Sequence, residues 1–68
     1  MIKVFAERLK ELRLEKGIGQ EQLAKELGVG KATISLWENA LREPKLYGLI
    51  TVAQYFGVSI DYLAGLED

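Results

Sequence analysis

The placement of glycine is the feature that most constrains how this chain folds. Gly17, Gly28, Gly57 and Gly65 each stand where a run of apolar residues with helical spacing stops. Glycine adopts the left-handed backbone conformation at a helix end without the steric penalty that a side chain brings. The pattern therefore predicts several short helices joined by tight turns.

Five helices are expected between these breaks, and no segment has the pattern of a strand or a flexible linker. Gly19 and Gly30 stand at the starts of the second and third helices, and Ser59 is a favourable N-terminal cap for the fifth. Pro44 marks residues 39–45 as a loop because the residue before a proline disfavours helical geometry. The first expected helix ends near residue 16. The other four cover 20–27, 31 to about 38, about 46–56 and a short segment after Ser59.

A chain of 68 residues has room for one small hydrophobic core. We therefore expect an all-α fold, a compact five-helix domain that spans residues 1–68 as a single unit. The chain has no cysteine and no histidine, which excludes disulfides, the usual zinc sites and Cys or His nucleophiles. Neither a metal nor a cofactor is expected.

Membrane and secretory segments are not expected either. No apolar run approaches the length of a membrane span, and Lys3, Glu7 and Arg8 interrupt the start of the chain where a signal peptide has its apolar core. We expect a cytoplasmic protein with no membrane partner.

The charges are unevenly distributed along the chain. Residues 1–45 carry nine basic and seven acidic side chains, a net charge of +2, whereas residues 46–68 carry three acidic side chains and no basic one, a net charge of -3. A polyanion is therefore expected to bind the first two thirds of the chain.

The second and third helices are joined by only three residues, 28–30, which forces them to cross steeply and lets the third helix project from the body. This arrangement predicts a helix-turn-helix over about residues 20–38. At about 100° per residue, Ile34 and Trp37 fall on the side of the third helix that packs into the core. The opposite, free face carries Lys31, Ala32, Ser35 and Leu36.

Three sequence motifs extend this pattern along nearly the whole chain. They are RLKELRLEKGIGQEQLAKELGVGKATISLWEN, then REP, then VSIDYL, with the specific combination QxxLAxxLGV and xxTISxWEN. In these motifs the sequence resembles the helix-turn-helix domains of the lambda-repressor-like (XRE) transcription regulators. The resemblance implies a third helix that enters the major groove of double-stranded DNA, as part of a symmetric dimer on a near-palindromic operator.

The resemblance also implies roles for individual residues. The base-facing positions are Lys31, Ala32, Ser35 and Leu36, and the positions expected to contact the DNA backbone are Gln20, Thr33, Asn39, Arg42 and Lys45. Arg13 and Glu38 match a pair that forms an ion pair between the first and third helices and orients the recognition helix.

The chemistry of the free face suggests what it contacts in DNA. Ala32 and Leu36 suit thymine methyl groups, Lys31 suits guanine O6 and N7, and Ser35 suits a base or a phosphate. Each assignment has a plainer alternative: Lys31, Arg42 and Lys45 as solvated charges, Leu36 as a surface or packing residue, and Gln20 as an ordinary helix start.

Three positions depart from the family pattern. Gly19 and Gly30 stand where the family has Ser, Thr or Asn, and Ala40 stands where glycine is common after Asn39. If Ala40 is left-handed, its Cβ is strained by about 1 kcal/mol or more. These departures bear on the affinity for DNA rather than on the fold.

The last third of the chain has more apolar residues than one helix stripe needs. Because this region has no basic residue, we expect a homodimer interface there, away from the DNA. Its expected residues are Tyr47, Ile50, Tyr55, Tyr62 and Leu66.

The sequence therefore predicts a sequence-specific DNA-binding transcription regulator, most simply a phage or bacterial repressor. The alternative is a protein-interaction module or an engineered variant of the same fold with weakened DNA binding, which the net charge of -1 and the glycine caps at Gly19 and Gly30 favour. An enzyme is the poorest alternative. Acidic pairs such as Glu11 and Glu15 lie on solvated helices, and the chain has no glycine-rich phosphate cradle and little volume for a closed pocket. No small-molecule substrate is expected.

Overall fold

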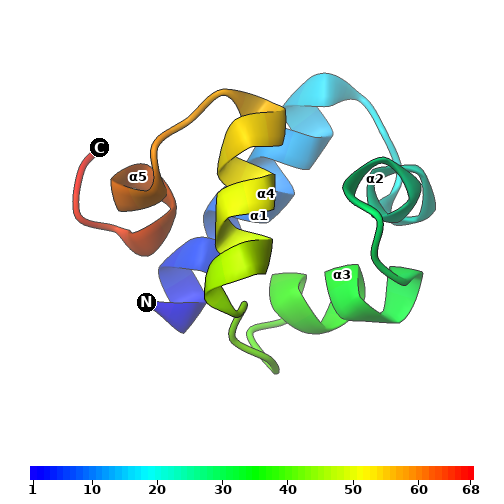
Figure 1. Cartoon of the computed structure of the whole chain (residues 1–68), viewed down its shortest axis with the longest axis horizontal. Helices are drawn as coiled ribbons and strands as arrows, with labels where there is room; N and C mark the ends of the chain where they lie inside the picture. Colours follow the sequence, from blue (N-terminus) through cyan, green and yellow to red (C-terminus); the bar gives the residue numbers. More distant parts are fainter.

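The computed structural model describes all 68 residues and contains five α-helices and no strand (Figure 1). The all-α, five-helix prediction is confirmed, and each helix lies where the sequence predicted it. The helices are α1 (Ile2–Lys16), α2 (Gln20–Leu27), α3 (Lys31–Glu38), α4 (Leu46–Phe56) and α5 (Ile60–Ala64).

Glycine ends four of the five helices in the left-handed conformation, as the sequence predicted. The φ angles are 74° at Gly17, 76° at Gly28, 68° at Gly57 and 83° at Gly65. At each of them the backbone N–H bonds to a carbonyl of the preceding turn. This pairing satisfies carbonyls that the helix end would otherwise leave without a donor.

The core is formed by side chains from all five helices. Phe5, Leu9, Leu23, Ile34 and Leu63 have no exposed surface. The ring of Phe5 packs edge-to-face against Trp37, with ring centroids 5.8 Å apart. Aromatic pairs favour this arrangement, and here it fixes α3 against α1.

The helices are arranged so that α3 lies at one edge of the molecule. α3 packs against α1 and α2, while α5 packs against α1 and α4. Figure 1 shows both chain termini beside α5, on the side away from α2 and α3. None of the five helices has the length and apolar character needed to span a bilayer.

The C-terminal turn is held against α1 by Arg8. Its Nη1 donates to the carbonyl oxygens of Tyr62 and of Glu67, the latter at 2.6 Å, and its guanidinium lies 4.2 Å from the centre of the Tyr62 ring. Two hydrogen bonds and a stacked ring on one cation give a well-defined geometry. The end of the chain is therefore fixed at the α5 side.

Candidate nucleic-acid interface

α3 presents one buried and one open face. Ile34 is fully buried and Trp37 is 5% exposed, which confirms that both are core residues. On the opposite face Lys31 and Ala32 are exposed, while Ser35 and Leu36 are half-buried. The four residues that sequence analysis assigned to bases thus share the accessible side of this helix.

An ion pair between Arg13 on α1 and Glu38 on α3 anchors the C-terminal end of α3. Nε of Arg13 lies 2.7 Å from Oε2 of Glu38, and Nη2 donates to Oε1 at 3.0 Å. Nη1 of Arg13 also donates to the carbonyl of Ile18 at 2.9 Å. The hydrogen bond to Glu38 raises the pKa of Arg13, so the guanidinium holds its charge although it is largely buried.

Gln20, at the start of α2, takes part in the same network. Its Nε2 donates to Oε1 of Glu38 at 3.1 Å, and the side chain is half-buried. An amide nitrogen carries two hydrogens, so this bond leaves a second donor for another acceptor. The phosphate contact of Gln20 stays a prediction, but Glu38 joins three helices at one carboxylate.

Asn39 directly follows α3 and closes its last turn. Its Nδ2 donates to the Ser35 carbonyl at 2.8 Å and to Ser35 Oγ at 3.3 Å. The next residue, Ala40, is the one non-glycine residue with positive φ, at 57°. Ala40 is therefore left-handed, and its Cβ is strained by about 1–2 kcal/mol.

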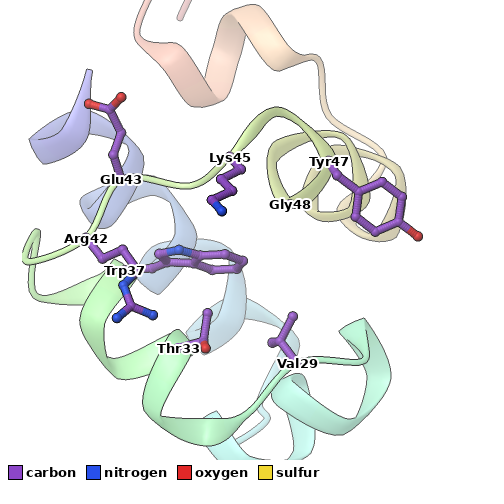
Figure 2. A pocket seen from close by; sticks show the side chains of 8 residues that line it. All are labelled: Val29, Thr33, Trp37, Arg42, Glu43, Lys45, Tyr47 and Gly48. Carbon is purple, nitrogen blue, oxygen red and sulfur yellow. The ribbon is translucent and has the colours of Figure 1, made fainter.

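A groove runs beside α3, between that helix, the loop after it and the first turn of α4 (Figure 2). Its volume is about 440 Å³. Arg42 and Lys45 are exposed and Thr33 is half-buried, so three of the five predicted backbone-contacting residues meet at this groove, while Gln20 and Asn39 lie outside it. The lining consists of Val29, Thr33, Trp37, Arg42, Glu43, Lys45, Tyr47 and Gly48.

The cations of this surface have no acidic partner. The salt bridge in the chain is Arg13 to Glu38, so Lys31, Arg42 and Lys45 form none. Figure 2 shows Lys45 pointing towards the Trp37 ring and Glu43 pointing away from it. Positive charge is therefore available along the side of α3, as an anionic partner requires.

The residues predicted for the dimer interface differ in their surroundings. Tyr47, 82% exposed, lies in the first turn of α4, and Leu66, 77% exposed, follows α5. Tyr62 lies under Arg8, and the hydroxyl of Tyr55 donates to Oε1 of Glu26 at 2.6 Å. Ile50 is half-buried. Tyr55 and Tyr62 thus already make contacts inside the chain, while Tyr47 and Leu66 remain largely free.

Three contacts were not predicted from the sequence: Gln20 to Glu38, Tyr55 to Glu26, and the close approach of Gly48 to Trp37. A Cβ at Gly48 would lie 3.1 Å from Cη2 and Cζ2 of Trp37. A glycine inside a helical pattern usually has a packing reason, so position 48 carried a signal in the sequence. The two hydrogen bonds carried none, because they join residues far apart in the chain.

The comparisons with known proteins agree with the geometry. A family model described as Helix-turn-helix matches residues 9–63. The HTH-type transcriptional activator BcrR of Enterococcus faecalis is 39% identical over 94% of this chain and 31% of its own length. The phage CTXphi transcriptional repressor RstR of Vibrio cholerae is 35% identical over 84% of this chain and 51% of its own length. The chain therefore spans about a third to a half of these relatives.

Solved structures with the same fold include a repressor bound to an operator and a protein bound to its substrate. The P22 c2 repressor, in complex with a synthetic operator, superposes with a TM-score of 0.82 at 34% identity, over 87% of this chain and 89% of that one. The Fe(II) form of HppE, in complex with substrate, gives the same TM-score and identity over 93% of this chain and 37% of that one.

Proposed function

This chain belongs to the lambda-repressor-like (XRE) helix-turn-helix family, and on that premise we propose that it binds double-stranded DNA and regulates transcription. In this proposal residues 1–68 act as one DNA-binding domain that places α3 in the major groove. The observation that carries it is the free face of α3, which lies opposite the buried Ile34 and Trp37 and next to the unpaired cations Arg42 and Lys45.

Base recognition is assigned to the four residues of that face. Ala32 and Leu36 are apolar and suit the methyl group of thymine, while Lys31 is a donor for guanine O6 and N7. Ser35 Oγ already accepts from Asn39, which leaves its hydroxyl proton for a base or phosphate acceptor. A half-site with at least one A·T step follows from this chemistry.

Backbone contacts are assigned to Gln20, Thr33, Asn39, Arg42 and Lys45. Gln20 is the first residue of α2, where unpaired backbone N–H groups and the positive end of the helix dipole attract a phosphate. Arg42 and Lys45 supply full charges on the other side of α3. Contacts of this kind fix the orientation of the protein on the duplex without reading its sequence.

The finer proposal is a repressor that binds a near-palindromic operator as a homodimer. The P22 c2 repressor, which matches nearly its full length to this chain, was solved on an operator, and the phage protein RstR is also named a repressor. Self-association is assigned to the region around Leu66, which is the most exposed large apolar side chain near α5. It lies at the end of the molecule away from α3 (Figure 1).

Selection of duplexes from a randomised DNA library tests this function. The purified chain is incubated with the library at moderate salt, and the bound pool is sequenced. Enrichment of a near-palindrome with half-sites about one helical turn apart is expected for a dimeric reader. A pool without any enriched motif would contradict sequence-specific binding.

The second candidate is a protein-interaction module with weak DNA affinity. The net charge of -1 favours it, because the chain as a whole then does not attract a polyanion. Salt dependence separates the two functions. Log affinity for DNA falls with log salt by about 0.9 per phosphate contacted, so a steep slope supports the regulator. An absent or salt-independent complex supports the interaction module.

A further inference from the structure

The groove beside α3 continues into a second, more enclosed hollow. This inner hollow has a volume of about 200 Å³ and shares Val29, Trp37, Tyr47 and Gly48 with the groove. The two spaces together run from the loop after α3 to the turn between α2 and α3. The groove alone, at about 440 Å³, already has the size of a small-molecule site, for which about 300–1,000 Å³ is usual.

The inner hollow suits an apolar ring. The backbone N–H groups of Gly28 and Val29 already bond to carbonyls of α2. The hydroxyl of Thr51, which also lines the hollow, donates to a carbonyl one turn earlier in α4 at 2.9 Å. The indole of Trp37 and the phenol of Tyr47 border the hollow, and aromatic rings favour edge-to-face or offset contacts with a further ring. An apolar cavity of about 150 Å³ accommodates a benzene ring, so the hollow has room for one such ring.

The outer part of the groove is positively charged. Arg42 and Lys45 line it, and neither forms a salt bridge. Glu43 is the one acidic residue of the lining, and Figure 2 shows its carboxylate pointing away from the Trp37 ring. A guanidinium binds a carboxylate through two parallel hydrogen bonds, and the ammonium of Lys45 adds a second cation. The rim of the groove therefore suits a carboxylate.

An apolar hollow and a cationic rim in one continuous groove select a ligand that has an aromatic ring at one end and a carboxylate at the other. A neutral ring would leave both cations unused, and a small inorganic anion would leave the inner hollow empty. We propose that the groove is a binding site for a small aromatic carboxylate, with its ring in the inner hollow and its carboxylate between Arg42 and Lys45. Gly48 keeps the site open, because it places no side chain between α4 and the edge of the Trp37 ring.

This site gives the chain a way to control DNA binding through a small molecule. Arg42 and Lys45 are also the cations that the proposed function assigns to DNA phosphates. A bound carboxylate occupies both of them, so the ligand and DNA compete for the chain. The competition rests on the proposed function, whereas the existence of the site does not.

Titration of the purified chain with hydrocinnamate tests the site without DNA. Trp37 is the only tryptophan in the chain and borders the inner hollow, so a saturable change in its fluorescence is expected. Hydrocinnamamide, which has the same shape without the charge, should bind about tenfold more weakly, and propanoate, which lacks the ring, should cause no change. No saturable change with hydrocinnamate, or equal affinity for the acid and the amide, would overturn the proposal.

Thr51→Leu tests the position of the ring, because it fills the inner hollow with a larger apolar side chain. Leucine forms helix more readily than threonine, so the fold is expected to be kept and hydrocinnamate binding to be lost. Gln54→Leu is the matched control, since Gln54 is exposed on the same helix and lines neither space, and it should bind like the wild type. Lys45→Ala removes one cation of the rim and should bind about fivefold more weakly. Unchanged binding in both Thr51→Leu and Lys45→Ala would overturn the assignment to this groove.

Displacement of DNA tests the regulatory step, with propanoate at the same concentration as the control for ionic strength. Hydrocinnamate is expected to release the wild-type chain from the duplex that the library selects. It is expected to leave Thr51→Leu bound, because Thr51 lies outside the surface assigned to DNA. Hydrocinnamate that binds the chain and leaves the duplex in place would overturn the competition. If the wild-type chain binds no DNA at all, the proposed function fails, while the Trp37 titration still decides whether the site exists.

Discussion

Glu38 accepts hydrogen bonds from both Arg13 and Gln20, so one carboxylate on α3 ties that helix to α1 and α2. The oxygen Oε2 lies 2.7 Å from Arg13 Nε, while Oε1 accepts from Arg13 Nη2 at 3.0 Å and from Gln20 Nε2 at 3.1 Å. The Glu38 side chain is only 3% exposed. The orientation of the free face of α3 therefore depends on a buried, fully bonded carboxylate.

Glu38→Gln is expected to lower the free energy of unfolding by about 3 kcal/mol, because it leaves the largely buried charge of Arg13 without its partner. Urea denaturation measures the change. Glu43→Gln, which removes an exposed carboxylate at the groove, serves as the control and is expected to change stability by less than about 0.5 kcal/mol. Equal stability of the two variants would mean that the ion pair does not anchor α3.

Ala40→Gly is expected to stabilise the chain by about 0.5–1 kcal/mol. The change relieves about 1–2 kcal/mol of left-handed strain at φ 57°, and the greater freedom of glycine in the unfolded chain offsets part of the gain. Thermal unfolding measures the difference. Gly57→Ala is the reverse control, because φ is 68° there and nothing lies near the added Cβ, so it should destabilise. A rise in stability in Gly57→Ala would contradict the strain argument.

Most of the fold could be predicted because glycine and helical periodicity are local signals. Gly17, Gly28, Gly57 and Gly65 each mark a helix end, since left-handed geometry there selects for the absence of a side chain. The split of α3 into two faces follows from the same periodicity, and the burial of Trp37 agrees with it.

The parts that could not be predicted depend on how distant segments meet. Gln20 looked like a free phosphate ligand because sequence does not show that Glu38 lies within hydrogen-bonding distance of it. Tyr47 and Leu66 were grouped because both are apolar and lie in the acidic third of the chain. In three dimensions Tyr47 borders the groove beside α3, whereas Leu66 follows α5.

Tyr55 is expected to titrate at an unusually high pH. Its hydroxyl donates to the carboxylate of Glu26, which raises the pKa of Tyr55 from 10.0 to about 12. Because the folded state holds this proton more tightly, the stabilising effect of the bond is complete below pH 10 and is lost as the pH rises through about 12. The near-ultraviolet absorbance of phenolate measures the titration. The step near pH 12 should be missing in Tyr55→Phe, and an unchanged titration curve in that variant would contradict the assignment.

The same hydrogen bond acts on Glu26 in the opposite direction. The bond from Tyr55, assisted by one from Gln22, lowers the pKa of Glu26 below 4.5. A lowered folded-state pKa means that this contribution to stability is present above pH 4.5 and is lost as the pH falls through the folded-state value. Acid unfolding of the wild type and of Glu26→Gln should therefore differ in their pH dependence below 4.5. Coincident pH profiles would show that this bond does not contribute in solution.

Lys31→Ala and Arg42→Ala are expected to weaken DNA binding in two different ways, although each removes one exposed cation. Lys31 lies on the free face of α3, so its loss should relax the preference for guanine at one position of the selected site, at a cost of about 1–3 kcal/mol there. Arg42 lies at the groove beside the helix, so its loss should weaken all sequences alike and reduce the salt slope by about 1.

Competition binding against single-base variants of the selected duplex, repeated over a salt series, separates these two effects. Lys10→Ala is a suitable control, because Lys10 is an exposed cation on α1 rather than on α3 or the groove, and it is expected to change neither quantity. If Lys31→Ala weakens every duplex equally and leaves the base preference intact, Lys31 contacts a phosphate. Sequence reading by α3 would then rest on Ala32, Ser35 and Leu36 alone, which offer methyl contacts and one hydroxyl, and specificity would have to come mainly from the deformability of the duplex.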